Sequence, residues 1–295
     1  MPERDGYIAG VPCWIDTSQP DPKAAVDFYG ALFGWEFENV MPPDAPGEYF
    51  MARIRGLDVG AVGSIPEGAP QMATWNTYIW VDSADDTASK VKEAGGSVMM
   101  EPFDVMTAGR MAVFTDPEGA VFFVWEAGDN KGSQVVNEHG SNNFNVLNTR
   151  DLEGAKRFYG AVFGWETLDL GGDGRMWTLP GYGDHLEEKS PGLRKGMEEM
   201  GAPADFADVV ASVTPIPADQ PDTPPHWSLT FAVDEADDIA SRAEELGGKV
   251  VMPPFDAPWV RMAVISDPQG ATFVASKFVP ENRDLQPAAN GAGAA

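Results

Sequence analysis

Short apolar stretches typical of strands alternate along this chain with longer stretches of helical spacing. The stretch "VPCWIDT" predicts a buried strand, and "PKAAVDFYGALF" places Phe28, Leu32 and Phe33 on one face of a helix. Asp21 precedes that helix as an N-cap, and Gly34 follows it as a left-handed C-terminal stop. The pattern therefore predicts a strand and then an amphipathic helix whose apolar face packs on a core.

Further strands and a second helix follow. The stretch "TYIWV" is rich in β-branched and aromatic residues, as strands are, and "DDTASKVKEAGG" predicts a helix that ends at two glycines. The stretches "AVFT" and "AVFFV" flank "DPEG", which has proline and glycine at the positions that a tight turn favours. We therefore expect a two-stranded hairpin after the second helix.

The whole pattern is written twice. "AVDFYGALFGWEF" returns as "AKRFYGAVFGWET", and "RMAVFTDPEGAVFFV" returns as "RMAVISDPQGATFVA", in the same order. A repeated supersecondary unit indicates duplicated modules. We predict an α+β fold of two tandem βαβββ modules that form curved mixed sheets with helices outside. The predicted boundaries are a first module at 1–130, a linker at 131–142, a second module at 143–278 and a disordered tail at 279–295.

The second copy is the longer one, because it carries an insertion at about 180–222. The insertion contains short amphipathic stretches such as "PADFADVVASV" between prolines and glycines. We expect it to pack over the mouth of one cavity as a lid, which would protect a bound ligand or exclude water. The alternative is a surface excursion without a role.

Composition restricts the possible partners. The 295 residues are 43% hydrophobic, which is enough for two modules, and the formal net charge of −26 disfavours nucleic acid and anionic membranes as partners. No apolar run approaches the ~20 residues that a membrane-spanning helix needs. The single cysteine, Cys13, cannot form an internal disulfide, and its strand-like surroundings predict a core thiol rather than a nucleophile. We therefore expect a cytoplasmic protein. We also expect a monomer or homodimer, and a monomer is reasonable because the duplication supplies both halves within one chain.

These residues resemble the vicinal oxygen chelate superfamily. The phrase FYG-x-x-FGW, the Asp-Pro-X-Gly hairpin and the tandem duplication carry the resemblance, which covers roughly residues 7–128 and 138–278. The superfamily includes glyoxalase I, bleomycin-resistance proteins, fosfomycin-resistance enzymes and extradiol dioxygenases. In detail the chain is similar to the actinobacterial tandem glyoxalase-like proteins. The resemblance implies the fold, whereas this scaffold hosts many chemistries.

The resemblance also implies where a metal ion would be held, because the superfamily's enzymes usually bind a divalent metal with His, Glu or Gln from three strand positions. Matched by motif, these positions are Trp14, Asn76 and Phe123 in the first copy, and Phe144, Ser228 and Val274 in the second. A first-row divalent ion prefers imidazole, carboxylate or thiolate donors, which none of the six supplies. A strand phase shifted by one residue brings in Cys13, Asn145, Thr77 or Trp227, and still gives no His–carboxylate cluster. We therefore expect no metal and no cofactor.

The histidines give the same expectation. The chain has three, and they fall in unlike elements: His139 in the linker, His185 in the insertion and His226 at the start of a strand. A metal centre built from residues so scattered is not expected.

Aromatic side chains take the place of the metal ligands. Because side chains alternate across a strand, the ligand-facing positions of the first copy form one set. They are Trp14, Asp16, Asn76, Tyr78, Trp80, Val121, Phe123 and Trp125. Such a wall of rings with a few polar tips suits a planar apolar molecule. The second copy offers smaller residues, namely Phe144, Val146, Ser228, Thr230, Thr272 and Val274, so we expect the first copy to be the main binder. The alternative is a sheet that closes on its own aromatic core without a cavity.

Arg110 and Arg261 recur before the two hairpins in the phrase "RMAV". An arginine in an apolar strand needs a partner. We expect pairing with a carboxylate such as Asp104 or Asp256, and a ligand anion is the alternative.

Three functions follow as hypotheses. The first is a metal-free glyoxalase-like protein that binds a small hydrophobic or aromatic molecule, as resistance-type relatives do, with Asn76 orienting the ligand. The second is a metal-independent lyase, isomerase or hydroxylase-like enzyme, for which Asp16, Tyr78 and His226 are the candidate acids and bases. The third is a metal-dependent lyase or dioxygenase of the usual superfamily type.

Overall fold

The computed structural model describes residues 3–170 and 175–285, and their strands form two eight-stranded sheets. The first sheet contains β1 (Pro12–Gln19), β2 (Glu36–Asn39), β3 (Tyr49–Ile54), β4 (Leu57–Ser64), β5 (Thr74–Trp80), β6 (Ser97–Val105), β7 (Gly109–Thr115) and β8 (Val121–Ala127). The second contains β9 (Ser141–Thr149), β10 (Glu166–Asp169), β11 (Arg175–Thr178), β12 (Val209–Pro215), β13 (His226–Ala232), β14 (Lys249–Ala257), β15 (Val260–Ser266) and β16 (Thr272–Phe278). The helices are α1 (Pro22–Phe33), α2 (Ala84–Glu93), α3 (Leu152–Phe163), α4 (Tyr182–Lys189), α5 (Leu193–Glu199) and α6 (Ala236–Glu245), with short 3₁₀ turns η1 (Ala204–Asp208) and η2 (Pro280–Asn282).

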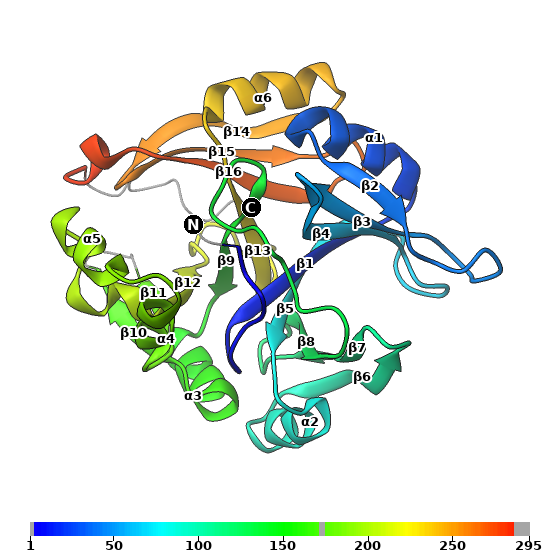
Figure 1. Ribbon diagram of the computed structural model, residues 1–295, viewed down its shortest axis with the longest axis horizontal. Helices are drawn as coiled ribbons and strands as arrows, with labels where there is room; N and C mark the ends of the chain where they lie inside the picture. Colours follow the sequence, from blue (N-terminus) through cyan, green and yellow to red (C-terminus); the bar gives the residue numbers. More distant parts are fainter. Residues whose placement is uncertain (1–2, 171–174, 286–295) are drawn as a thin grey trace.

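The two sheets have the same topology. Their strand orders are β2-β3-β4-β1-β5-β8-β7-β6 and β10-β11-β12-β9-β13-β16-β15-β14. The pairs β1–β4 and β5–β8 are parallel and the others in the first sheet are antiparallel, so the sheet is mixed. Figure 1 shows two curved sheets with helices α1, α2, α3 and α6 on the outside. The predicted fold is confirmed, and the structure shows in addition that each module contains the strand–helix–three-strand unit twice.

The helix ends follow the local signals in the sequence. The Asp21 carboxylate accepts hydrogen bonds from the backbone N–H groups of Lys23 and Ala24 at 3.1 Å each, and so caps α1. Gly34 ends α1 with a φ of 71°, and Gly164 ends α3 with a φ of 74°. Both glycines thus adopt the predicted left-handed stop, a conformation that disfavours side chains.

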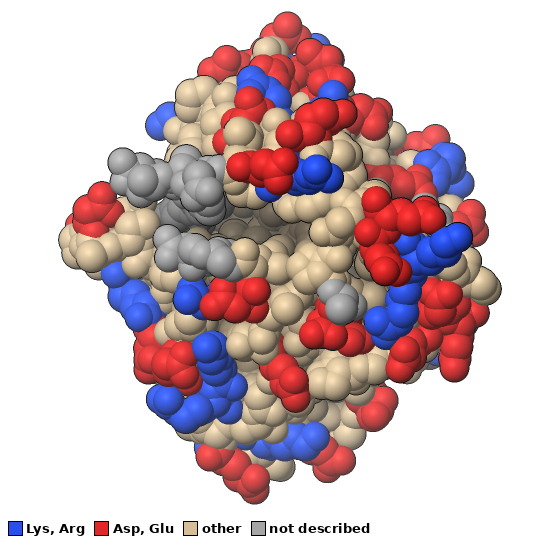
Figure 2. Space-filling view, turned by 90° about the vertical axis from the view of Figure 1, so that its left-hand side faces the viewer, with Lys and Arg blue, Asp and Glu red and all other residues tan. Residues whose placement is uncertain are grey.

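The two faces of each sheet have different roles. On β1, Ile15 points to the convex side and joins the hydrophobic core, whereas Trp14 and Asp16 point to the concave side. We call the concave face of the first sheet, which carries these two residues, the first cup. The concave face of the second sheet, which carries Phe144 and Val146 at the corresponding positions of β9, is the second cup. Figure 2 shows the side of the molecule on which β10, β11 and β12 of the second sheet lie in Figure 1, and a hollow with charged side chains around its rim opens there.

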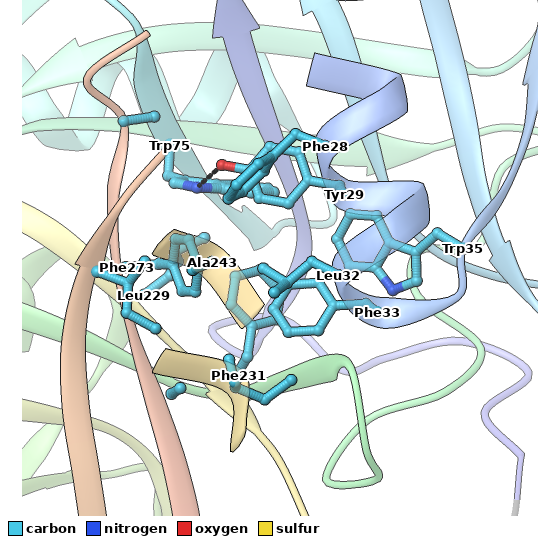
Figure 3. Packing of buried hydrophobic residues seen from close by; sticks show 14 of the residues in the cluster. Phe28, Tyr29, Leu32, Phe33, Trp35, Trp75, Leu229, Phe231, Ala243 and Phe273 are labelled. Atoms are coloured by element: carbon cyan, nitrogen blue, oxygen red, sulfur yellow. Dashed lines mark hydrogen bonds between the residues drawn. The ribbon is translucent and has the colours of Figure 1, made fainter. Parts of the chain in front are cut away.

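The modules are joined by a core in which α1 packs on the second sheet (Figure 3). The Tyr29 hydroxyl of α1 donates to the Asp267 carboxylate of the second module's hairpin at 2.9 Å, and it accepts from Trp75 Nε1 at 3.2 Å. The reciprocal bond runs from Tyr159 of α3 to Asp116 of the first hairpin at 3.1 Å. Each aspartate of the repeated turn therefore binds a tyrosine of the other module, so the duplication builds its own interface.

We expect Tyr29→Phe to lower the free energy of unfolding by about 2 kcal/mol, because the buried Asp267 carboxylate loses a donor and Trp75 Nε1 loses its acceptor. Urea unfolding followed by circular dichroism measures the change. Tyr182→Phe is the matched control at another buried tyrosine, because among the described residues its hydroxyl bonds only Arg4, from which it accepts at 2.9 Å. Equal losses in the two variants would show that the Tyr29–Asp267 bond contributes nothing special to the interface.

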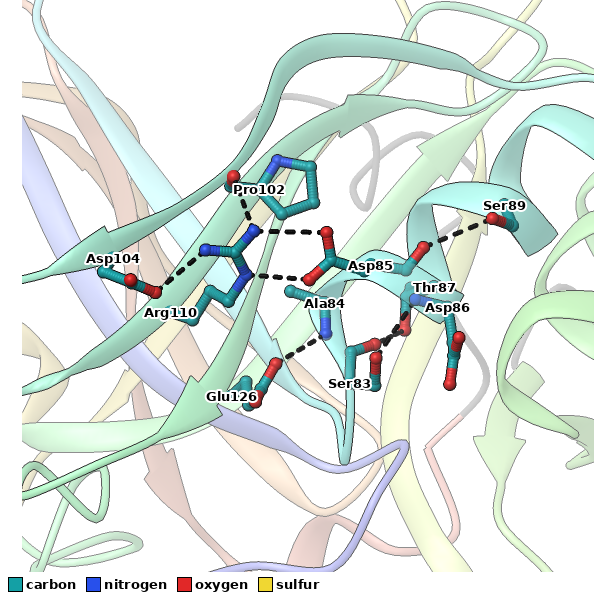
Figure 4. A network of polar contacts seen from close by, with 10 residues as sticks. All are labelled: Ser83, Ala84, Asp85, Asp86, Thr87, Ser89, Pro102, Asp104, Arg110 and Glu126. Carbon is teal, nitrogen blue, oxygen red and sulfur yellow. Dashed lines mark hydrogen bonds and ion pairs between the residues drawn. The ribbon is translucent and has the colours of Figure 1, made fainter.

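The repeated arginines are structural, as expected. Arg110 donates to Asp104 at 2.8 Å and, through Nε, to Asp85 at the start of α2 at 2.8 Å (Figure 4). Arg261 lies 3.3 Å from Asp256 and also binds the corresponding aspartate of α6. The pairings with Asp104 and Asp256 are confirmed, and the helix aspartates are partners that the sequence reasoning missed.

The insertion differs from its prediction in one respect. The second half of "PADFADVVASV" is β12, a central strand of the second sheet, rather than a short amphipathic stretch of a lid. The helices α4 and α5 precede it, and α4 borders a cleft that Tyr7, Trp80 and His185 line. A lid role for these helices stays a prediction. Of the predicted tail, 279–285 contains η2, and 286–295 lies outside the described residues. Among the described residues, no helix has the length and apolar character needed to cross a membrane.

Candidate ligand-binding site

A buried carboxylate lies at the centre of the first cup. Asp16, which is only 5% exposed, accepts hydrogen bonds from Asn76 Nδ2 at 2.8 Å and from the hydroxyls of Tyr78 and Tyr49 at 2.8 and 2.9 Å. Burial raises the pKa of Asp16, and the three donors oppose that rise because they stabilise the ionised form. Asp16 and Tyr78 are thus brought together as two candidate acid–base groups. Tyr49 was missed, although alternation along "YFMARI" places it on this face.

Rings fill the space around Asp16. Trp14 Nε1 donates to the Tyr49 hydroxyl at 3.1 Å, and the Tyr78 and Phe123 rings lie 4.7 Å apart. Trp14, Tyr78 and Trp125 are each less than a tenth exposed and belong to one hydrophobic cluster. Asn76 is buried as well, and Phe123 and Trp80 are half-buried. The predicted wall of rings exists, but its members pack largely on one another.

Chain segments from outside the sheet close one end of the first cup. The Ser133 N–H of the linker donates to the Cys13 carbonyl at 2.8 Å, and the Tyr7 hydroxyl donates to the Ser133 carbonyl at 2.6 Å. Trp125 Nε1 donates to the Asn130 carbonyl at 3.0 Å. Cys13 itself is buried, which raises the pKa of its thiol and makes it a poor nucleophile, as expected of a core residue.

The second cup has the same backbone but smaller side chains. Strand register matches Trp14 with Phe144, Asp16 with Val146, Asn76 with Ser228, Tyr78 with Thr230 and Trp125 with Ser276. The loss of these rings leaves space. Phe144 and Val146 are accordingly only half-buried, whereas their first-cup counterparts are buried, and the face is hollowed (Figure 2).

The candidate metal positions lie on the two cups but do not fit a metal ion. In the first cup the three side chains are an indole, an amide and a benzene ring, and in the second a benzene ring, a hydroxyl and an isopropyl group. No group of three or more His, Cys, Asp or Glu side chains in the described part of the chain could hold a metal ion. His226 begins β13 in the second module, so it does not join Asp16 and Tyr78 in the first. His139 contacts Asp234, and His185 lies on α4.

The sequence matches the model of the Glyoxalase/Bleomycin resistance protein/Dioxygenase superfamily over residues 14–124 and again over 142–274. The chain belongs to this superfamily. Both matches fall on the duplicated modules, so the resemblance inferred from the repeated motifs is confirmed.

Relatives align along nearly the whole chain. The protein CFP32 of Mycobacterium bovis, whose name contains the word glyoxylase, is 38% identical over 95% of this chain and 100% of its own length. The anthracycline biosynthesis protein DnrV of Streptomyces peucetius is 36% identical over 97% of this chain and 98% of its own. Both alignments span the two modules, so the tandem arrangement is shared.

Solved structures of the superfamily show the same fold. The Mn(II)-bound glyoxalase of Novosphingobium aromaticivorans superposes with a TM-score of 0.58 at 16% identity, over 92% of this chain and 83% of that chain. The 2,3-dioxygenase LapB of Pseudomonas sp. KL28 gives a TM-score of 0.57 at 12% identity, over 92% and 93%. At these identities the likeness concerns the fold alone.

Proposed function

We propose that this glyoxalase-like protein binds a small hydrophobic or aromatic molecule without a bound metal, and that the second cup receives it. The hollow of the second cup carries the proposal (Figure 2). Its wall presents half-buried apolar side chains, among them Phe144, Val146 and Met176, on a rigid sheet. An apolar concave surface of this kind is the usual form of a small-molecule site.

The superfamily relatives support an aromatic ligand. One relative of similar length is named for anthracycline biosynthesis, and anthracyclines are compounds with flat fused rings. A flat ring system would stack on Phe144 and bury its faces against Val146 and Val274. Such binding, without turnover, is the sequestration role that the sequence predicts. The cytoplasmic location and the monomeric or dimeric state stay predictions.

The preference for the first module stays a prediction as well, and burial argues against it. The rings of Trp14, Tyr78 and Trp125 occupy the first cup themselves, so a ligand there would have to displace them. In the second cup Thr230 and Ser276 stand at the positions of Tyr78 and Trp125, so a bound molecule would not have to displace rings there. Substitutions of Phe144 in the second cup and Phe123 in the first distinguish the two sites.

The test uses a matched pair of variants. Phe144→Leu in the second cup is expected to weaken binding of a neutral fused-ring compound about tenfold, because a stacking ring is lost, and Phe123→Leu in the first cup is expected to change it less than twofold. Affinity is measured by equilibrium dialysis and tryptophan fluorescence quenching, with and without a metal chelator. The chelator is expected to have no effect. The reverse pattern of losses would move the site to the first cup, and affinity that requires a metal would overturn the metal-free proposal.

The Asp16 network favours a second candidate function. A buried carboxylate with a raised pKa, bonded to two tyrosine hydroxyls, is a chemically reasonable acid–base centre for a metal-independent lyase, isomerase or hydroxylase-like enzyme. Tyr49 is half-buried and is the member of the network nearest to solvent. Turnover of an aromatic substrate that disappears in Asp16→Asn, while ligand affinity is retained, would favour this function over binding alone.

A further inference from the structure

A row of neutral polar side chains crosses the floor of the second cup. Asn148, Ser228, Thr230 and Ser276 lie on the adjacent strands β9, β13 and β16, and they are 3%, 6%, 7% and 5% exposed. Their neighbours on the same strands, Leu147, Leu229 and Ala275 among them, belong to the cores on the convex side, so alternation directs the four polar side chains into the cup.

The row has more hydrogen-bonding capacity than the described residues use. Asn148 Nδ2 donates to Ser228 Oγ at 2.9 Å, which leaves the Ser228 O–H free to donate. In the described part of the chain, the hydroxyls of Thr230 and Ser276 have no hydrogen-bond partner. They are also not among the fully enclosed unpaired atoms, which are Gln19 Oε1, Asn142 Nδ2 and Trp177 Nε1. The hydroxyls of Thr230 and Ser276 are therefore not fully enclosed and face the hollow.

The chemistry of the row differs from that of the first cup. The position of Asp16 is taken by Val146, and the cup-facing positions of β13 and β16 carry no carboxylate, lysine or arginine; Lys277 of β16 binds Glu235 instead. Water can bond hydroxyls that face the hollow, and an acceptor atom on a ligand would take the place of that water. A charged ligand group would lose its hydration there. His226, which begins β13 on the same face, lies at the end of the row beside Asn148, and its Nδ1 contacts the Pro224 carbonyl oxygen at 2.8 Å.

We propose that the second cup selects neutral flat molecules that carry a carbonyl oxygen, which accepts hydrogen bonds from the hydroxyls of Ser228 and Thr230 while Phe144 and Val274 contact the rings. This inference rests on the proposed function, because it specifies which class of aromatic molecule the cup takes. Ser228 and Thr230 follow each other on the cup face of β13, and Val146, Phe144 and Val274 lie beside them on the neighbouring strands. A carbonyl at the edge of a ring system therefore meets donors while the rings remain in apolar surroundings.

Fluorenone and fluorene test the inference, because they share a flat ring system and differ in the carbonyl. We expect the full chain to bind fluorenone about tenfold more tightly than fluorene, as one net hydrogen bond allows. Ser228→Ala combined with Thr230→Val is expected to reduce the preference to less than about twofold. The infrared carbonyl band of fluorenone is the second readout. We expect the wild-type protein to shift this band to lower wavenumber, and the double variant to return it towards its value in an apolar solvent. Ser89→Ala combined with Thr87→Val makes the same chemical changes on α2, far from the cup, and is expected to leave both readouts unchanged.

The outcomes separate the inference from the function beneath it. Equal affinities for the two probes, or an unshifted carbonyl band, would overturn carbonyl recognition and leave aromatic binding intact. A preference that survives the double variant would also overturn it. No binding of either probe up to its solubility limit would remove the proposed function together with this inference.

Discussion

Rebuilding the first module's rings in the second cup is expected to abolish ligand binding. Thr230→Tyr and Ser276→Trp introduce the residues that stand at the corresponding positions of the first sheet, Tyr78 and Trp125. Those rings fill the first cup, and the shared backbone topology directs their copies into the hollow of the second. Burying a flat aromatic ligand contributes on the order of 3 kcal/mol, so its exclusion should weaken binding at least about hundredfold.

Stability controls distinguish exclusion from unfolding. The new rings enter open space, so we expect the free energy of unfolding in urea to change by no more than about 1–2 kcal/mol, the lower range for added bulk in a packed site. Met72→Trp, at a position that is 69% exposed, adds a ring without entering either cup and is expected to leave affinity unchanged. Undiminished binding by the folded double variant would contradict the placement of the ligand in the second cup.

Local signals in the sequence were sufficient for the repeated helices and hairpins. Asp21, Gly34 and the Asp-Pro-X-Gly turns act through neighbours within a few residues, so their roles can be inferred from the chain alone. The strands β2–β4 gave weaker signals, since β2 is short and exposed and β4 carries two glycines in a strand. The first strand–helix–three-strand unit of each module, to which these strands belong, was therefore harder to recognise than the duplication itself.

The openness of a cup could not be inferred from strand patterns. Alternation correctly assigns Trp14 and Phe144 to concave faces, but it does not tell whether a ring lines a cavity or fills it. That depends on segments remote in sequence. Tyr7 and Ser133 close the first cup from the N-terminal segment and the linker, and no motif marks either of them. Asn148 and Ser276 of the polar row were missed for a different reason: alternation places them on the cup face, two residues beyond Val146 and Val274, but the predicted set ended at those two residues.

The stability contributed by Asp16 is expected to depend on pH in a specified direction. Burial raises the pKa of Asp16 in the folded protein above that of the unfolded chain, which lies at about 3.9. The folded state therefore binds more protons than the unfolded chain as the pH rises above about 4. The stability that Asp16 contributes in this way is fully present below about pH 4 and is lost as the pH rises through the pKa of Asp16 in the folded protein. In the Asp16→Asn variant the side chain at this position cannot ionise, so the variant does not lose unfolding free energy in this way. Relative to the variant, the wild-type protein should lose up to about 1.4 kcal/mol of unfolding free energy per pH unit within that window.

Urea unfolding of both proteins between pH 4 and pH 8 measures this difference directly. Burial also raises the pKa of Asp116, but Asp116 is present in both proteins, so its effect cancels when the two are subtracted. A difference that stays constant with pH would mean that the pKa of Asp16 is unshifted. A difference of opposite sign would mean that the donors Asn76, Tyr78 and Tyr49 outweigh burial and hold the carboxylate ionised. In that case Asp16 could not act as a proton donor near neutral pH, and the first cup would be a structural half whose buried charge joins three strands.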